Sequence, residues 1–458
     1  MKRLITLIGL SLLVFSISAI SLDESVNLAL KNNRNLLIAK EEVEKANMSY
    51  NDVRGTLLPQ ITLQGGYELS RTHLPPNAIP GEVNFMPGLS QTASMDDYYL
   101  AGALAGVVNN MIPTTPQDQA SVALQVKMTQ VLFLGGKLVN GIKAVDRYRS
   151  IQRLNYWVEE QNLILKTNEL FYQCLLAEKL VQVQQDGLDM ANQHLARVEA
   201  FFEEGMVSEF DLLRARLEVA KLEPQVLQAQ NTYEIALSAF RMHLGSEDES
   251  LVPEGEFVLP EKMEVTLEEA LSSGKEKRVE LELLDIATEV AQIKYNAERG
   301  NYLPNIALTA DYSLYTAADD FSIEKDDFGS RYSVGIGIQI PIFTGLSNTA
   351  KRNRARSEYL QAQYQQRDLE NMIRLEVTQN WQNLQHTLHN HEVQSQNIRM
   401  AERSLEIAQA RYDNQVGIQL EVFDARITLS GIRLQYLQSI YDIIIDQLKL
   451  TKSMGIKI

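Results

Sequence analysis

The amino-acid sequence predicts a mainly α-helical chain with a β-barrel part, in which long antiparallel coiled-coil helices accompany four transmembrane strands per protomer. Three observations lead to this fold class. Short motifs recur at fixed offsets, four segments alternate apolar and polar residues, and the stretches 136–204 and 346–414 contain no proline. Recurring motifs indicate two structural repeats, alternation indicates strands, and long proline-free stretches indicate helices.

Residues 1–21, at the N-terminus, have the organisation of a secretory signal peptide. Lys2 and Arg3 precede an apolar run from Leu4 to Ile17, and small residues follow this run. A charged start, an apolar core and small residues before a cleavage point are the three parts of such a signal. We therefore expect the mature chain to leave the cytoplasm.

The composition excludes several classes of protein. The net charge of −16 argues against nucleic acid as a partner, because phosphate binding requires clustered cations. After residue 20, no apolar run reaches the roughly 20 residues that a membrane-spanning helix needs. With 45% hydrophobic and 22% charged residues, the chain does not resemble a disordered protein either. The single cysteine, Cys174, cannot form an internal disulfide, and we expect it to pack between helices.

Recurring motifs divide the mature chain into a first repeat, 22–245, and a second repeat, 266–458. The sequence LLPQI at 57–61 returns as YLPNI at 302–306, an offset of 245, whereas FLG at 133–135 returns as FTG at 343–345, an offset of 210. Because the later motif returns at a smaller offset than the earlier one, the first repeat must contain additional residues between these two motifs. We assign them to a long loop at about 72–118, which is rich in proline, and residues 246–265 to an inter-repeat linker.

Two segments of each repeat alternate apolar and polar residues and are expected to form strands, at about 58–71, 120–134, 303–315 and 331–344. The clearest case is the last, in which five apolar residues alternate with small or polar ones: Tyr332, Val334, Ile336, Ile338 and Ile340. Alternation is typical of a lipid-facing β-barrel and equally of a soluble antiparallel sheet. The alternation alone leaves both possibilities open.

Four long helices are expected at about 136–204, 208–244, 346–414 and 419–454. A continuous helix over either of the proline-free stretches would reach about 100 Å at 1.5 Å per residue. Apolar residues near the ends of these stretches recur in steps of three and four, which is the spacing of a coiled coil. We therefore expect antiparallel helix pairs, with a local kink or a broken hydrogen bond at Pro224.

Four strands per chain cannot close a barrel in lipid. Open strand edges there would leave backbone amides without hydrogen-bond partners, at several kcal/mol each. The edges must therefore meet the edges of identical subunits. Two copies would give eight strands, whose side chains nearly fill the interior, whereas three copies would give twelve strands around a water-filled lumen. This argument favours a homotrimer.

Over its mature length, from residue 22 to 455, the chain resembles the TolC-like outer-membrane efflux proteins. The resemblance lies in the repeated Leu-Pro and Phe-x-Gly motifs and in two helix-turn-helix tips, FEEGMVSEFDLLRAR at 202–216 and YDNQVGIQLEVFDAR at 412–426. It implies a trimeric, twelve-stranded barrel in the outer membrane and an α-helical tunnel in the periplasm, with the long extracellular loop at about 72–118. The protein would be a passive channel rather than an enzyme. A periplasmic adaptor protein and an inner-membrane transporter would bind at the tips.

The resemblance also implies a periplasmic gate at the tips. Glu421 and Asp424 match acidic residues that ring the constriction, and Asp211 and Tyr412 match gate-holding contacts. Acids near a helix N-terminus also complement its dipole, so the residues alone leave both roles open. The adaptor-docking positions would be Gly205, Met206, Val207, Ser208, Gln415, Val416, Gly417 and Ile418. Gly417 replaces a basic residue and Gln415 replaces a glycine of the family pattern, so packing or other pairs are expected to hold the gate.

Other chemistry finds little support in the sequence. His386, His389 and His391 lie close together, but a helical pair at i, i+3 without an accompanying cluster of cysteines or carboxylates is a weak metal signal, so a solvated helix face is expected rather than a metal site. No nucleophile elbow or phosphate-binding loop is present, and no cofactor is expected. The alternatives to a channel are a trimeric coiled-coil structural or adhesin-like envelope protein and a soluble periplasmic binding protein. The cargo cannot be inferred from generic lumen-facing residues.

Overall fold

The computed structural model describes residues 18–72, 84–90, 92–111, 117–318, 323–414 and 416–458. Its described residues form two compact units. The helical unit takes its residues from Met1–Ser49, Ala144–Ile293 and Arg354–Ile458, and the sheet unit takes its residues from Tyr50–Lys143 and Lys294–Asn353.

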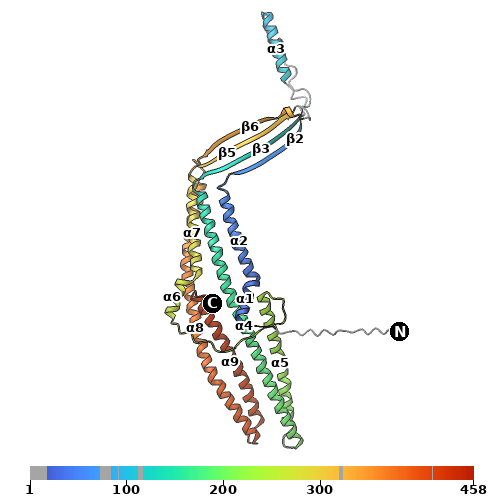
Figure 1. Ribbon diagram of the computed structural model, residues 1–458, viewed down its shortest axis with the longest axis vertical. Helices are drawn as coiled ribbons and strands as arrows, with labels where there is room; N and C mark the ends of the chain where they lie inside the picture. The colour runs from blue at the N-terminus through green and yellow to red at the C-terminus, as the bar shows by residue number, and fades with distance from the viewer. Residues whose placement is uncertain (1–17, 73–83, 91, 112–116, 319–322, 415) are drawn as a thin grey trace, which may run out of the picture. The chain divides into compact units, whose positions relative to one another are not determined.

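Two antiparallel helix pairs dominate the helical unit (Figure 1). The first pair is α4, Lys137–Glu203, with α5, Glu209–Leu244, and the second is α8, Ser347–Asp413, with α9, Gln419–Ser453. Both α4 and α8 contain 67 residues, and their bounds differ by the motif offset of 210. None of the helices in the described part of the chain is both long and apolar enough to cross a membrane.

Narrow apolar seams hold each helix pair together near its tip. In the first pair, Val198 packs against Leu212 and Ala215. The seam of the second pair is longer, with Leu405 and Val422 among its buried residues. Seam residues on each helix are spaced by three or four positions, so one stripe of each helix faces its partner. Helix α5 continues through Pro224, which therefore removes one backbone hydrogen bond without ending the helix.

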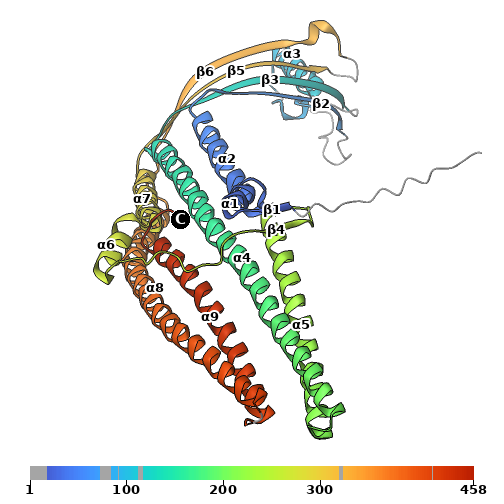
Figure 2. The same ribbon diagram turned by 60° about the horizontal axis from the view of Figure 1, so that its bottom comes forward.

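Four shorter helices lie beside the two longest ones (Figure 2). Next to α4 lie α1, Leu22–Asn32, and α2, Arg34–Gly55, and next to α8 lie α6, Leu267–Lys277, and α7, Val279–Arg299. Helices α1 and α6 begin with capping boxes at Ser21 and Thr266. In each box, the hydroxyl oxygen accepts a hydrogen bond from a backbone amide of the first turn that has no partner within the helix. The core beneath α1 contains Phe171, Phe240 and Cys174. The Cys174 thiol is buried between helices, as the sequence predicts. Burial raises the pKa of this thiol to about 12.

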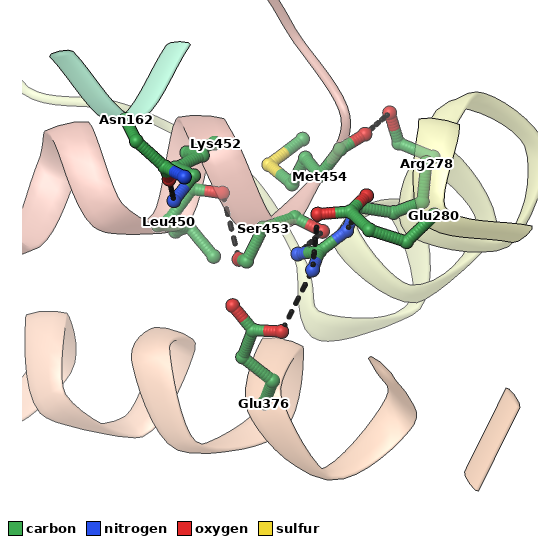
Figure 3. A network of polar contacts seen from close by, with 9 residues as sticks. Asn162, Arg278, Glu280, Glu376, Leu450, Lys452, Ser453 and Met454 are labelled. Carbon is green, nitrogen blue, oxygen red and sulfur yellow. Dashed lines mark hydrogen bonds and ion pairs between the residues drawn. The ribbon is translucent and has the colours of Figure 1, made fainter. Parts of the chain in front are cut away.

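The C-terminal end of α9 is tied to α6, α7 and α8 by a polar network (Figure 3). At its centre, the buried guanidinium of Arg278 donates to Glu280 at 3.0 Å, to Glu376 at 2.9 Å and to the carbonyl of Ser453 at 3.4 Å. Lys452 donates to Asn162 of α4. A buried cation with three acceptors is well satisfied, so this network fixes where α9 ends.

The helical unit also contains a small sheet of two three-residue strands. Strand β1, Ser18–Ile20, pairs in parallel with β4, Leu251–Pro253. The first lies within the expected signal peptide, and the second lies within the expected inter-repeat linker. Ile20 and Leu251 are both part of the core beneath α1.

The sheet unit contains a four-stranded antiparallel sheet. Its strands are β2, Gln60–Thr72; β3, Gln117–Leu134; β5, Asn305–Ala318; and β6, Gly329–Gln339. The order β2-β3-β5-β6 leaves β2 and β6 as edges. Large apolar side chains remain open to solvent in the single chain: Leu63 is 71% exposed and Ile336 is 64% exposed. The sheet therefore lacks a core of its own.

The chain between β2 and β3 includes secondary structure that the long-loop assignment did not anticipate. Residues 86–88 form a short 3-10 helix, η2, and α3 spans Met95–Met111. The Asp97 carboxylate accepts hydrogen bonds from the amide and the hydroxyl of Ser94, and these bonds lower the pKa of Asp97. A capped first turn explains why a glycine-rich apolar segment forms a helix here.

Two segments of the sheet unit that are distant in the sequence approach each other backbone to backbone, one directly after β3 and one directly before β5. Gly135 directly follows β3, and Gly300 lies in η3, Gly300–Tyr302, before β5. A Cβ built on Gly135 would lie 2.2 Å from the Gly300 carbonyl oxygen, and one built on Gly300 would lie 2.1 Å from the Gly135 carbonyl oxygen. Gly135 also has a φ of 61°, which side chains disfavour. Neither position has room for a methyl group.

We expect Gly300→Ala to lower the free energy of unfolding by about 1–3 kcal/mol, the usual effect of overpacking. Urea unfolding of the purified, detergent-solubilised protein, followed by circular dichroism, measures this change. Gly141→Ala is the matched control, because nothing lies within 4 Å of a Cβ at that helix position. Equal stability of the two variants would contradict the proposed close contact.

Candidate functional site

The tip that joins α4 to α5 is a tight turn held by backbone bonds and a capping box. Gly205 adopts a φ of 72°, which lets the Met206 amide donate to the Phe201 carbonyl at 2.8 Å. At the start of α5, the Asp211 carboxylate accepts hydrogen bonds from the Ser208 amide at 3.2 Å and from its hydroxyl at 2.6 Å. Asp211 thus has a local structural role, whatever its part in a gate.

The tip that joins α8 to α9 is built around Gly417. The amides of Val416 and Gly417 both donate to the Arg411 carbonyl at 3.0 Å. Arg411 Nε lies 3.4 Å from a Glu421 carboxylate oxygen. A Cβ on residue 417 would lie 2.9 Å from the Arg411 Cβ and 3.1 Å from that same carboxylate oxygen. Glycine therefore leaves room for the Arg411–Glu421 pair. Gln415 lies outside the described residues.

The two acidic candidates of the second tip lie on the solvent-facing side of α9. Glu421 and Asp424 are exposed, whereas Val422 between them is buried in the seam with α8. Their spacing of three residues places both carboxylates on one helix face, as the sequence predicts. Arg411 compensates Glu421 in the single chain, and this partner was not identified from the sequence.

Most of the expected docking positions present side chains to solvent. The exposed fractions are 49% for Met206, 69% for Val416 and 60% for Ile418. Val207 differs, because it packs against the seam of the first helix pair. Three exposed apolar side chains at the turns form a surface that suits another protein better than water.

Tyr412 lies where the two helix pairs meet. Its ring is 5.4 Å from the ring of His194 of α4, with the two planes tilted by 58°. Burial raises the pKa of Tyr412, and the nearby carboxylates of Asp211 and Asp413 raise it further. Tyr412 and Asp211 therefore lie within electrostatic reach of each other, while the ring contact of Tyr412 is with His194.

Three contacts that the sequence did not reveal link the first helix pair to the second. The His194 and Gln419 Nε2 atoms lie 3.0 Å apart, and these residues are only 3% and 7% exposed. Near the surface, Arg197 and Asp413 form an ion pair at 3.6 Å. The third contact is a cation–π pair in which the Arg214 guanidinium lies 5.6 Å from the Phe423 ring.

His194 is neutral in this arrangement. Burial lowers its pKa to about 4, and the positive charges of Arg426 and Arg197 act in the same direction. In the orientation present, a neutral imidazole accepts the amide hydrogen of Gln419. Protonation would require the Gln419 amide to rotate and would add a positive charge beside Arg426 and Arg197. The contact between the helix pairs therefore depends on the charge state of His194.

The three histidines of α8 do not form a metal site. Among the described residues, no group of three or more His, Cys, Asp and Glu side chains could hold a metal ion. The expectation of a solvated face is wrong for His391, whose Nδ1 lies 2.8 Å from the Ser439 hydroxyl and whose ring lies 5.1 Å from that of Tyr436. Burial lowers the pKa of His391.

Sequence comparison connects this chain to proteins of known kind. A family model described as outer membrane efflux protein matches residues 25–246 and 271–456. The outer membrane protein TolC of Escherichia coli K12 is 23% identical over 476 residues, which cover 99% of this chain and 87% of the relative. The outer membrane efflux protein BepC of Brucella suis is 21% identical over 332 residues, which cover 72% of this chain and 71% of the relative.

Solved structures share the fold. A crystal structure of CusC matches with a TM-score of 0.74 at 20% identity, over 95% of this chain and 92% of the other. The CmeC outer membrane channel of Campylobacter jejuni matches with a TM-score of 0.72 at 16% identity, over 95% of this chain and 85% of the other. Because the family model covers most of both repeats, the chain belongs to the family of TolC-like outer membrane efflux proteins.

Proposed function

We propose that three copies of this protein form the outer-membrane duct of a tripartite efflux or secretion system. The duct would conduct its cargo passively from a periplasmic adaptor and an inner-membrane transporter to the cell exterior. The observation that carries this proposal is the sheet of β2, β3, β5 and β6, which exposes its apolar side chains and has two edges without a strand neighbour in the described residues.

If neighbouring copies join edge to edge, the open strand edges gain hydrogen-bond partners and the exposed apolar side chains can face lipid. If β2 of one copy pairs with β6 of the next, every strand has two neighbours and the backbone amides are satisfied in lipid. Three copies close twelve strands around an open lumen. Apolar residues on alternate positions of these strands would then face hydrocarbon.

We expect the protein to fractionate with the outer membrane, to have the mass of three chains in detergent, and to conduct ions in planar bilayers. Native mass spectrometry and single-channel recording of the same preparation measure these properties. A stable, water-soluble monomer without currents would refute the proposed duct.

The tips of the helix pairs would form the gate. In a threefold assembly, Glu421 and Asp424 contribute six carboxylates around the axis, and like charges held close together repel one another and attract cations. Arg411 offsets part of this repulsion through its pair with Glu421. The exposed apolar residues Met206, Val416 and Ile418 would meet the adaptor.

Changing Glu421 and Asp424 together to Ala should raise single-channel conductance and lower cation selectivity, by about twofold or more, because the carboxylates attract cations and narrow the pore. Planar-bilayer recordings with a salt gradient measure both quantities. Glu406→Ala is the matched control, since Glu406 is an exposed α8 carboxylate paired with Arg403. Unchanged currents in the double variant would contradict the assignment of these acids.

Opening of the gate would separate α8 and α9 from α4 and α5 at the tips. Such a movement must break the His194–Gln419 contact and the Arg197–Asp413 ion pair. His194 has a pKa of about 4 when buried, below its ordinary value of 6.5. The separated state would therefore bind a proton more readily than the closed state between these two values, and acid would favour opening.

We expect the open probability of the wild type to rise as the pH falls from 6.5 to 5, a range in which exposed carboxylates stay ionised. His194→Gln keeps a side chain that can bond to Gln419 but cannot titrate here, so this variant should lose the response. Single-channel recordings of both proteins across the pH series measure the effect. An identical acid response in the variant would exclude His194 as the titrating group.

A further inference from the structure

A cavity of about 300 Å³ lies within the helical unit, where α4, α5 and α9 meet. Along α9 its lining begins at Phe423, within one turn of Glu421, and extends to Leu434. Most of its lining is apolar: Val183, Met190, Leu222, Phe423, Ile427 and Leu434. A cavity of this size and lining suits the body of a small organic molecule.

One wall of the cavity carries a buried cation, two of whose nitrogen atoms have no acceptor in the described structure. Arg426 is 8% exposed, and its Nε and Nη1 atoms have no hydrogen-bond partner in the described part of the protein. Burial lowers the pKa of Arg426, but a guanidinium remains charged at neutral pH. A buried charge without a counter-ion is costly and is normally paired.

None of the other charged groups that line the cavity forms an ion pair with Arg426 in the described structure. Glu218 is 7% exposed and lies within electrostatic reach of Arg426, but its carboxylate forms no ion pair in the described structure. Burial raises the pKa of Glu218, which weakens it as a counter-ion. Arg433 already pairs with Glu402 at 3.3 Å, and Lys221 is exposed to solvent. The cavity therefore has an excess of positive charge.

The three surrounding helices each carry a helix-weakening residue at this level. Gly187 of α4 and Gly431 of α9 line the cavity, and nothing lies within 4 Å of a Cβ built on either. In α5, Pro224 precedes the lining residue Gln225. Glycine inside a helix weakens it relative to alanine, and proline removes a hydrogen bond. The sequence thus leaves space here at a cost in helix stability.

We propose that this cavity binds an organic carboxylate with an apolar body. The carboxylate would accept hydrogen bonds from Arg426 and supply the missing negative charge. The hydrocarbon body would lie against Leu222, Phe423 and Ile427. A cation would meet Arg426 with the wrong charge, and a neutral molecule would leave the guanidinium uncompensated. The ligand would contact both helix pairs, because its walls come from α4 and α5 on one side and from α9 on the other.

Isothermal titration of the full-length mature protein in lipid nanodiscs tests this proposal, with octanoate as the probe and empty nanodiscs as the blank. The wild type should bind octanoate saturably and should bind octanol and octylammonium at least about tenfold more weakly. Arg426→Met should weaken octanoate binding by a similar factor, whereas Arg403→Met, which removes an exposed arginine of α8, should not change it.

Gly187→Leu provides a second and independent variant. It keeps Arg426 but fills the cavity, and leucine favours a helix more than glycine, so the protein should fold and lose octanoate binding. Absence of saturable octanoate binding by the wild type would overturn the proposal, as would unchanged binding by Gly187→Leu. Because binding is measured without currents, its outcome is separate from that of the proposed duct.

Discussion

The unpaired edges and bare faces of one four-stranded sheet set the requirements for the rest of the molecule. Strands β2, β3, β5 and β6 pair with one another through backbone hydrogen bonds, yet among the described residues β2 and β6 each have one edge without a strand neighbour, and large apolar side chains of the sheet are exposed. Such a sheet is stable only where its apolar side chains meet hydrocarbon and its edges meet further strands. The edge-to-edge assembly proposed above would provide both.

The long elements could be predicted closely from the sequence, because their signals extend over many residues. The expected helices at 136–204 and 346–414 correspond to α4, Lys137–Glu203, and α8, Ser347–Asp413. Short or weakly patterned elements could not be predicted. Strands β1 and β4 have three residues each, too few for any period, and α3 lies in a glycine-containing apolar segment that resembles a loop.

The candidate site could likewise be predicted only in part, where its geometry is set within a single helix. Glu421 and Asp424 lie together on one helix face, as their spacing implies, because spacing within one helix is a local property. The partners of these elements depend on how one helix is rotated against another, which periodicity does not specify. His194 lies on the flank of its own seam, three residues after Ala191, and only the second helix pair reveals its role through Gln419. The Arg411–Glu421 ion pair could not be predicted either, because it depends on the space that Gly417 leaves beside it.

The contact between Gly135 and Gly300 joins two segments that lie far apart in the sequence. Each glycine fills the space where the other's side chain would be. A side chain at either position would displace the backbone at the other, so a substitution at one position cannot be accommodated unless both segments shift. The turn that follows β3 and the turn that precedes β5 are therefore held together as one rigid junction.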